Sequence, residues 1–351
     1  MPGVQHLTVE PDETEQRLDR WFRRRFPHVP HGRVEKMLRK GEIRIDGARA
    51  KAADRVSTGQ TVRVPPLPDP EEVSASRRMK SDAQVSEADR EMLQACVLYK
   101  DAEVIVLNKP PGLPVQGGSG QARHLDGMLG ALSFDRSDKP RLVHRLDKDT
   151  SGVLLLARTV PAAAALAKAF HGRDTDKIYW AAVSGVPKPR AGTIRTGLVK
   201  APGHGPHGVG EKMLAIATEA VKTTEGAKRA STDFTVVEAM GDRAAWMALR
   251  PITGRTHQLR VHMAELGCPI VGDGKYGTNR IEKEDGRYGA QLGGEISRKL
   301  HLHARSIAIP HPAGKGMLRA TAPLPDHMRR TWAAFGWDDG AAPSDPFEDI
   351  E

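Results

Sequence analysis

The stretch RLVHRLDKDTSGVLLLA, residues 141–157, is the most informative part of the sequence. Apolar residues flank a polar centre, HRLDKDTSG, which predicts a strand, a tight loop and then a buried strand, VLLLA. Such a loop can hold Asp147 or Asp149 at the floor of a cleft. A plain turn, in which both aspartates cap local backbone groups, is the more frequent arrangement and stays open at this point.

A second polar stretch, PITGRTHQLRVHMAELGCPIVGDGKYG, covers residues 251–277. Its Thr253-Gly254 pair predicts a turn that leads into a helix from about Arg255 to Leu266. Because Arg255 and Arg260 are five residues apart, their side chains point in different directions on that helix. A basic helix that lies on the surface is the alternative interpretation.

Two further segments alternate apolar and polar residues as strands do, and both carry polar rings. TDKIYWAAVSGVP (175–187) contains Tyr179, which base rates favour as a core residue; a chemical role requires that its hydroxyl reach a cleft. LHLHARSIAI places His301 and His303 on one face of a strand. Histidines in that position are more often buried and hydrogen-bonded than bound to a metal.

No metal site or disulfide framework is expected. The two cysteines, Cys96 and Cys268, do not form a CxxC pair. His257 and His262 are five residues apart, whereas two metal ligands on one helical face prefer a spacing of four.

Positive charge is concentrated near the N-terminus. The chain has a net charge of +9, and residues 16–63 alone hold fourteen Lys and Arg against five Asp and Glu, which is 14 − 5 = +9. Within this region RLDRWFRRRFP (17–27) and HGRVEKMLRKG (31–41) each place apolar residues on one helical face, and EIRIDG and QTVRVPP alternate as strands do. A basic module of this kind is suited to a polyanion, because Lys and Arg release the counterions condensed on phosphates.

The composition along the chain predicts an α+β protein with two domains. We expect a small, basic α/β domain at 1–66, a proline-rich linker at 67–92, a larger domain at 93–334 and an acidic, disordered tail at 335–351. The larger domain should contain a mixed, mostly antiparallel sheet around a central cleft. Neither a run of about 18 apolar residues nor a secretory signal occurs, so we expect a cytoplasmic protein without membrane partners.

Taken together, these segments resemble the RluA/RluC/RluD family of pseudouridine synthases, in order and spacing, across roughly 95–325. HRLDKDTSGVLLLA is similar to the family's signature around its catalytic aspartate, and NKPPGLPVQGGSG (108–120) to the segment upstream of it. KIYWAAVSG is similar to the segment with the active-site tyrosine, RPITGRTHQLRVHMAELGCPIVGD to that with the active-site arginine, and LHLHARSIAIPHP to a final core strand. Residues 16–63 resemble the S4-type RNA-binding module, which points to the branch that modifies ribosomal RNA.

The resemblance implies a role for particular residues. Asp147 resembles the catalytic aspartate, and Arg145 the arginine that enters the RNA stack where the target uridine leaves it. Tyr179 resembles the tyrosine that lies against the flipped base, and Arg260 the arginine that forms an ion pair with the aspartate. Asp149 and Arg255 are then the neighbours without these roles.

Further binding residues follow from the same resemblance. Substrate binding is expected of His144, next to Arg145, and of Lys109 in the NKPPG segment. RNA binding by the basic domain is expected of four cations in its second helix, Arg33, Lys36, Arg39 and Lys40.

The implied activity is the isomerisation of specific uridines to pseudouridine in large-subunit (23S) ribosomal RNA, through base flipping and a catalytic aspartate. The reaction gains no atoms, so it requires no redox cofactor or energy donor. We expect a monomer whose partner is ribosomal RNA or a precursor particle. Two alternatives are a transfer RNA pseudouridine synthase and a non-enzymatic RNA-binding ribosome-assembly factor; the latter does not require Asp147, Tyr179 and Arg260 together.

Overall fold

The computed structural model describes residues 3–67, 69, 85–117, 123–172, 174–202, 212–277, 296–343 and 345–348. The chain divides into two compact units, Met1–Gln84 and Val85–Glu351, which are considered separately. Most of the predicted linker and part of the GGSG segment lie outside the described residues. Within those residues, no helix is long and apolar enough to cross a membrane.

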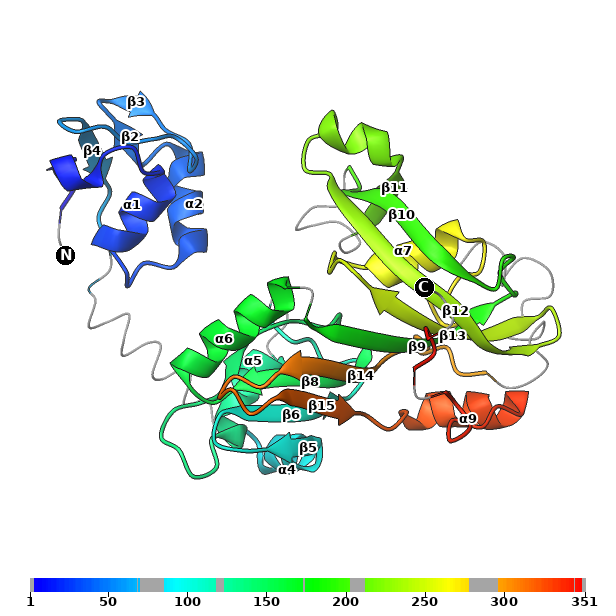
Figure 1. The fold of residues 1–351 in the computed structure, drawn as a ribbon. Helices are drawn as coiled ribbons and strands as arrows, with labels where there is room; N and C mark the ends of the chain where they lie inside the picture. The colour runs from blue at the N-terminus through cyan, green and yellow to red at the C-terminus, as the bar shows by residue number, and fades with distance from the viewer. Residues whose placement is uncertain are drawn as a thin grey trace. The chain divides into compact units, whose positions relative to one another are not determined.

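The smaller unit is a four-stranded antiparallel sheet with two helices (Figure 1). Its elements are β1 (Gln5–Thr8), the 3-10 helix η1 (Pro11–Glu13), α1 (Leu18–Arg25), α2 (His31–Lys40), β2 (Arg44–Ile45), β3 (Ala48–Arg49) and β4 (Thr61–Val64), with strand order β1-β4-β2-β3. The apolar faces predicted for both helices are confirmed, since Trp21, Phe22 and Leu38 are buried in one core. Gly41 ends α2 in the left-handed conformation, at a φ of 71°.

The larger unit is built on one eleven-stranded sheet, which confirms the prediction of a mixed, mostly antiparallel sheet. The strand order is β11-β10-β12-β13-β9-β14-β8-β6-β5; β15 pairs with β14, β7 pairs with β8, and the β14–β8 pair is parallel. The strands are β5 (Val97–Lys100), β6 (Val104–Lys109), β7 (Arg141–Leu142), β8 (Ser151–Ala157), β9 (Asp176–Ser184), β10 (Ala191–Lys200), β11 (Met213–Ile216), β12 (Lys228–Met240), β13 (Ala244–Pro251), β14 (Leu302–Pro310) and β15 (Met317–Thr321).

Helices pack on both faces of this sheet (Figure 1). The helices are α4 (Glu87–Ala95), α5 (Leu125–Met128), η2 (Leu129–Leu132), α6 (Val160–His171), η3 (Thr218–Lys222), α7 (Gln258–Glu265) and α9 (Asp326–Phe335). Successive side chains of β6 point to opposite faces of the sheet, and each face is covered by helices. Ile105 and Leu107 face the cluster that includes α4, α5 and η2, whereas Val104 and Val106 face the cluster that includes α6. Because β6 and β8 are covered on both sides, they read as continuous apolar runs.

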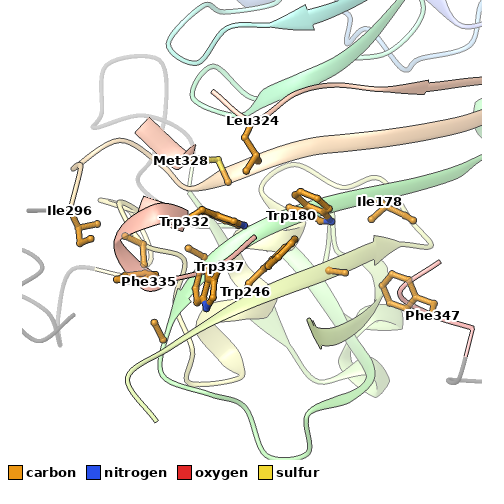
Figure 2. Close-up of a cluster of buried hydrophobic side chains, with 14 residues drawn as sticks. Ile178, Trp180, Trp246, Ile296, Leu324, Met328, Trp332, Phe335, Trp337 and Phe347 are labelled. Carbon is orange, nitrogen blue, oxygen red and sulfur yellow. The ribbon is translucent and has the colours of Figure 1, made fainter. Parts of the chain in front are cut away.

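The prediction of a disordered tail at 335–351 was wrong for the described residues of that segment, 335–343 and 345–348. Residues Trp337 and Phe347 are buried in a cluster with Trp246 and Trp332, shown in Figure 2. The indole of Trp337 packs against Trp332, with ring centroids 5.2 Å apart. The acidic residues and prolines between these two aromatic residues have a composition typical of a solvated tail, which led to the wrong prediction. Burial of the two aromatic rings instead holds the segment against the core.

The end of the predicted linker also differs from the structure. Residues Glu87–Ala95 form α4, and Leu93 is buried in the core of the larger unit. Ser86 begins the helix, because its hydroxyl accepts a hydrogen bond from the amide of Asp89 at 3.1 Å. This cap was the local signal for a helix in a segment otherwise rich in charge.

Candidate active site

The loop between β7 and β8 carries Asp147, as the sequence predicted. The carbonyl of Asp147 accepts a hydrogen bond from the amide of Thr150 at 3.2 Å, which closes the turn. The Asp147 side chain is 31% exposed, so it faces solvent from a partly buried position, whereas Asp149 is exposed. Gly152 follows at a φ of 107°, and a Cβ there would come within 2.2 Å of the carbonyl oxygen of Ala304 in β14. Glycine therefore allows β14 to run close against the start of β8, directly after the loop.

Lys109 braces this loop and is buried, which differs from its predicted role in substrate binding. Its Nζ donates to the carbonyl oxygens of Pro110 at 2.9 Å, Leu113 at 3.0 Å and Lys148 at 3.0 Å. An ammonium group has three protons, so these bonds use all of them. Burial lowers the pKa of Lys109 to about 8, an effect that the negative charges of Asp149 and Asp147 oppose. Lys109 thus ties the segment after β6 to the Asp147 loop, and it has no proton left for a substrate.

His144 contacts the scaffold around the loop. Its Nε2 accepts a hydrogen bond from the amide of Leu155 at 2.8 Å, and its ring lies 4.4 Å from that of Phe170 in α6. Burial, followed by the positive charge of Lys177, lowers the pKa of His144 to about 3. The imidazole is therefore neutral and fixes the approach to the loop.

Arg145 is exposed on the same loop. Its Nη1 donates to Oε1 of Gln116 at 3.1 Å, and no other hydrogen bond of this guanidinium occurs among the described residues. An exposed guanidinium with one neutral partner can leave that partner at little cost.

Tyr179 extends from β9 toward the same region. It pairs with Leu249 of β13 and with Ala304 of β14, so it lies in the centre of the sheet. Burial, and then the negative charge of Asp147, raises the pKa of the Tyr179 hydroxyl well above its usual range. The structure therefore brings the phenol and Asp147 within electrostatic reach, with the phenol in its protonated form.

Arg260 is also brought to Asp147, but its ion-pair partner is different from the predicted one. Its Nε and Nη2 donate to the two carboxylate oxygens of Asp273, at 2.7 Å and 2.6 Å. Burial lowers the pKa of Arg260, but the hydrogen bonds and charge of Asp273, with the charge of Asp147, raise it overall. Asp147 therefore acts on this guanidinium through its charge, while Asp273 forms the hydrogen-bonded ion pair.

Asp273 is a site residue that the sequence interpretation did not identify. One of its oxygens also accepts the amides of Lys275 at 2.9 Å and Tyr276 at 3.1 Å, which fixes the carboxylate in its own turn. The sequence VGDGKYG contains the signal for that turn, since aspartate beside glycine commonly binds the backbone two or three residues further on. The side chain is buried together with that of Arg260, which makes the pair a fixed element of the site.

His257 is the second residue that was missed as a member of the site. It lies directly before α7 in the left-handed conformation, at a φ of 53°, and its Nε2 is 4.0 Å from Oδ2 of Asp147. Its Nδ1 is 2.8 Å from the hydroxyl of Tyr276. Burial lowers the pKa of His257, an effect that the charge of Asp147 opposes. The predicted helix thus begins three residues later than expected, and the turn before it delivers the imidazole to the carboxylate.

The four cations predicted to bind RNA lie on α2 in the smaller unit. Arg33, Lys36, Arg39 and Lys40 are all exposed, and three of them line a hollow of about 520 Å³ together with Glu42 and Pro66. Lys40 forms a weak, exposed ion pair with Glu42 at 3.7 Å.

Neither unit offers a metal centre in the part of the chain that the structure describes, where no group of three potential ligands gathers. The predicted burial of His301 and His303 is confirmed. His301 contacts the hydroxyl of Thr331 at 2.8 Å, and His303 that of Ser151 at 2.9 Å.

Comparisons with known proteins place the chain among relatives. A family model described as RNA pseudouridylate synthase matches residues 103–265, which include Asp147, Tyr179 and Arg260. The chain is 33% identical to "Ribosomal large subunit pseudouridine synthase C" of Vibrio cholerae serotype O1, over 93% of this chain and 95% of that protein. It is 33% identical to "RNA pseudouridine synthase 4, mitochondrial" of Arabidopsis thaliana, over 91% of this chain and 79% of the relative.

A solved structure is similar as well. "Human RNA Pseudouridylate Synthase Domain Containing 4" aligns with a TM-score of 0.57 and 31% identity, over 70% of this chain and 95% of the human one.

Proposed function

Because this chain belongs to the RNA pseudouridylate synthase family and is therefore a pseudouridine synthase, we propose that its substrates are uridines of large-subunit ribosomal RNA. One observation carries the choice of substrate. The chain and the Vibrio cholerae relative named for the ribosomal large subunit correspond over 93% and 95% of their lengths. Since 7% of 351 residues is only about 25, most of the smaller, basic unit has a counterpart in that relative.

The smaller unit supplies the affinity for RNA in this proposal. Four exposed cations lie on α2, and three of them, Arg33, Lys36 and Lys40, line a hollow at its surface. Contacts of this kind bind phosphates whatever the base, and they hold a long RNA without selecting a nucleotide. The S4-type character of this unit rests on its sequence and remains part of the proposal.

Base flipping explains why Arg145 and Tyr179 flank the Asp147 loop. A uridine in a stack must leave it before an enzyme can reach the bond between its base and ribose, at a cost of a few kcal/mol. The exposed guanidinium of Arg145 fills the gap, and the ring of Tyr179 stacks on the extruded base, which returns about 1–3 kcal/mol.

Asp147 performs the chemistry on the flipped nucleotide. The bond between N1 of uracil and C1′ of the ribose breaks, the ring turns, C5 bonds to C1′, and the proton on C5 leaves while N1 gains one. The Arg260–Asp273 pair sits beside this carboxylate and gives a fixed positive edge, which keeps a charge acceptable in a partly buried site. Tyr179, whose raised pKa keeps its hydroxyl protonated, accepts the C5 proton as it passes its own proton to Asp147.

We further propose that the protein works as a monomer in the cytoplasm, where the ribosomal RNA of a bacterium is assembled. The mitochondrial name of the Arabidopsis relative belongs to that protein.

The substrate is tested by mapping pseudouridines in ribosomal and transfer RNA from cells with the gene, without it, and with the Asp147→Asn allele. The proposal expects specific large-subunit pseudouridines to vanish in both mutant strains. Loss confined to transfer RNA would contradict the substrate. An unchanged map together with defective ribosome assembly would identify the chain as an assembly factor and overturn the proposal.

A further inference from the structure

The position of His257 beside Asp147 has a geometric consequence. The 4.0 Å between Nε2 and Oδ2 is too long for a hydrogen bond, whose donor and acceptor lie about 2.7–3.2 Å apart. One oxygen atom placed between them is nevertheless within about 2.8 Å of both. Only 9% of the His257 side chain is exposed, so the imidazole is held in place and cannot turn away.

The tautomer of His257 follows from Tyr276. The Tyr276 oxygen accepts a hydrogen bond from the amide of Met213 at 2.9 Å, and His257 Nδ1 lies 2.8 Å from the same oxygen. Among the described residues, Nδ1 is the acceptor that the structure offers to the hydroxyl proton. With Tyr276 donating to Nδ1, the proton of the neutral imidazole resides on Nε2 and points toward Asp147.

The backbone at His257 supports a specific role. Its φ of 53° lies in the left-handed region, which residues other than glycine adopt uncommonly and often at functional positions. This conformation occurs here in a turn that places the imidazole between the carboxylate and Tyr276.

We propose that His257 and Asp147 together bind the 2′-hydroxyl of the target uridine, with His257 Nε2–H donating to the hydroxyl oxygen and the hydroxyl donating to Asp147. The atom between an N–H donor and a carboxylate must accept one hydrogen bond and donate another. The carbonyl oxygens of uracil carry no proton, and within an RNA chain the 2′-hydroxyl is the one free hydroxyl of each nucleotide. This hydroxyl is attached to the carbon next to C1′, so its capture holds the reacting carbon beside the carboxylate.

The inference rests on the proposed function in that Asp147 is taken as the carboxylate that acts at the ribose. It also explains how the site distinguishes RNA from DNA without reading the base. His257 is then a substrate-binding residue of the reaction, and Tyr276, which acts through it, is a positioning residue.

The test is a cycle of two proteins and two RNAs. The probe is an oligoribonucleotide around a uridine that the wild-type enzyme converts, made with either uridine or 2′-deoxyuridine at that position. His257→Asn removes the ε-position donor and tolerates the left-handed backbone, since asparagine adopts it readily. Single-turnover rates are measured at saturating RNA, with the folded state of each variant checked by circular dichroism.

The wild type should convert the uridine probe at least about tenfold faster than the deoxyuridine probe, and His257→Asn should lower this ratio to about threefold or less. His257→Gln, whose amide reaches the ε position, should recover rate on the uridine probe only. Tyr276→Phe should lower the ratio part of the way. An unchanged ratio in His257→Asn would overturn the inference and make the imidazole a scaffold or a contact to the uracil edge.

Failure of the proposed function gives a different result. If the wild type converts uridines only in transfer RNA, the ribosomal substrate is wrong, and the same cycle on a transfer RNA probe still decides the role of His257. An Asp147→Asn protein that remained active would contradict the catalytic assignment, whatever the ratio.

Discussion

The charged groups proposed to function in the two units are placed in opposite ways. The smaller unit displays its cations, such as Arg33 and Lys36, on the solvent side of α2. The larger unit buries ionised groups and pairs them, as with Arg260 and Asp273, or saturates them with carbonyl oxygens, as with Lys109. Exposed charges contribute little to stability and remain free to bind phosphate, whereas buried charges fix geometry and are expensive to leave unpaired.

The region that carries the net positive charge is therefore different from the region that carries the proposed catalytic groups. The +9 excess of the sequence lies in residues 16–63, yet the groups that surround Asp147 come from 109–276. Substitutions in the larger unit should therefore change the rate of reaction or the fold, and substitutions on α2 should change the affinity for RNA.

The largest effect is expected at Asp147. Asp147→Asn keeps the size of the side chain but removes its charge and its basic oxygen, so the single-turnover rate should fall by at least about 10³-fold. Tritium release from RNA labelled at C5 of uridine measures it, because that hydrogen leaves only when the base is rejoined through carbon. Asp149→Asn, two residues away and exposed, is the matched control and should stay within a few-fold of wild type. Equal losses in both would contradict the assignment.

Arg260→Met should lower the free energy of unfolding by about 3–5 kcal/mol, because it leaves Asp273 buried without its cation. Urea denaturation of the larger unit measures the change. Arg255→Met is the control, since Arg255 is exposed and should cost less than about 0.5 kcal/mol. A stable Arg260→Met protein would mean that the pair matters for catalysis alone.

The two units should also differ in acid. Burial lowers the pKa of His303 to about 4 from an ordinary value of 6.5, so its neutral form stabilises the larger unit fully above 6.5 and less as the pH falls toward 4. At pH 5, His303 alone lowers the free energy of unfolding of the larger unit by about 2 kcal/mol relative to neutral pH. In the smaller unit, the hydrogen bond from Arg25 is the main reason that the pKa of Glu13 falls to about 2 from 4.5. The contribution of ionised Glu13 to the stability of that unit is therefore lost only below pH 4.5.

Hydrogen exchange of the full chain at pH 7 and pH 5 measures both units at once. Protection should decrease in β8, β9 and β14 and persist in α1 and α2. A uniform loss of protection would contradict the difference between the units.

Neutralising the basic face of α2 should weaken RNA binding about tenfold and reduce the slope of log K against log salt by up to about 3. In the variant, glutamine replaces each of Arg33, Lys36, Arg39 and Lys40. The control replaces four exposed cations of the larger unit, Lys188, Arg190, Lys315 and Arg319. Fluorescence anisotropy across a salt series measures both, and equal slopes would mean that α2 is simply solvated.

Tyr179→Phe should have the smallest effect, slowing the chemical step several-fold, while Tyr179→Ala should also lose about 1–3 kcal/mol of stacking. Single-turnover rates and affinities measured with the same RNA separate the two losses. If Phe and Tyr give the same rate, the hydroxyl has no role and only the ring matters.

Local pattern was sufficient to predict several of the elements. The apolar faces of α1 and α2, the alternation of β9 and the loop that carries Asp147 are set by neighbours in sequence. The partner of Arg260 was not predictable in this way. Asp273 and Asp147 both carry the required charge, and only the turn that anchors Asp273 to its own backbone decides between them.

Composition gave a wrong prediction for the C-terminal segment, where two aromatic residues determine the packing. Trp337 and Phe347 hold the C-terminal segment, although acidic and small residues surround them in sequence. His257 was dismissed because its spacing from His262 does not suit a metal, yet its role depends on a positive φ that no pattern of side chains reveals.

The separation of affinity from chemistry is tested most directly by measuring two numbers, the dissociation constant for RNA and the single-turnover rate at saturating RNA, for Asp147→Asn and for the α2 variant side by side. We predict that Asp147→Asn abolishes the rate and leaves the dissociation constant within a few-fold of wild type. The α2 variant should weaken binding about tenfold and keep the wild-type rate once RNA is saturating. A wild-type rate in Asp147→Asn, or a loss of rate at saturation in the α2 variant, would contradict the account.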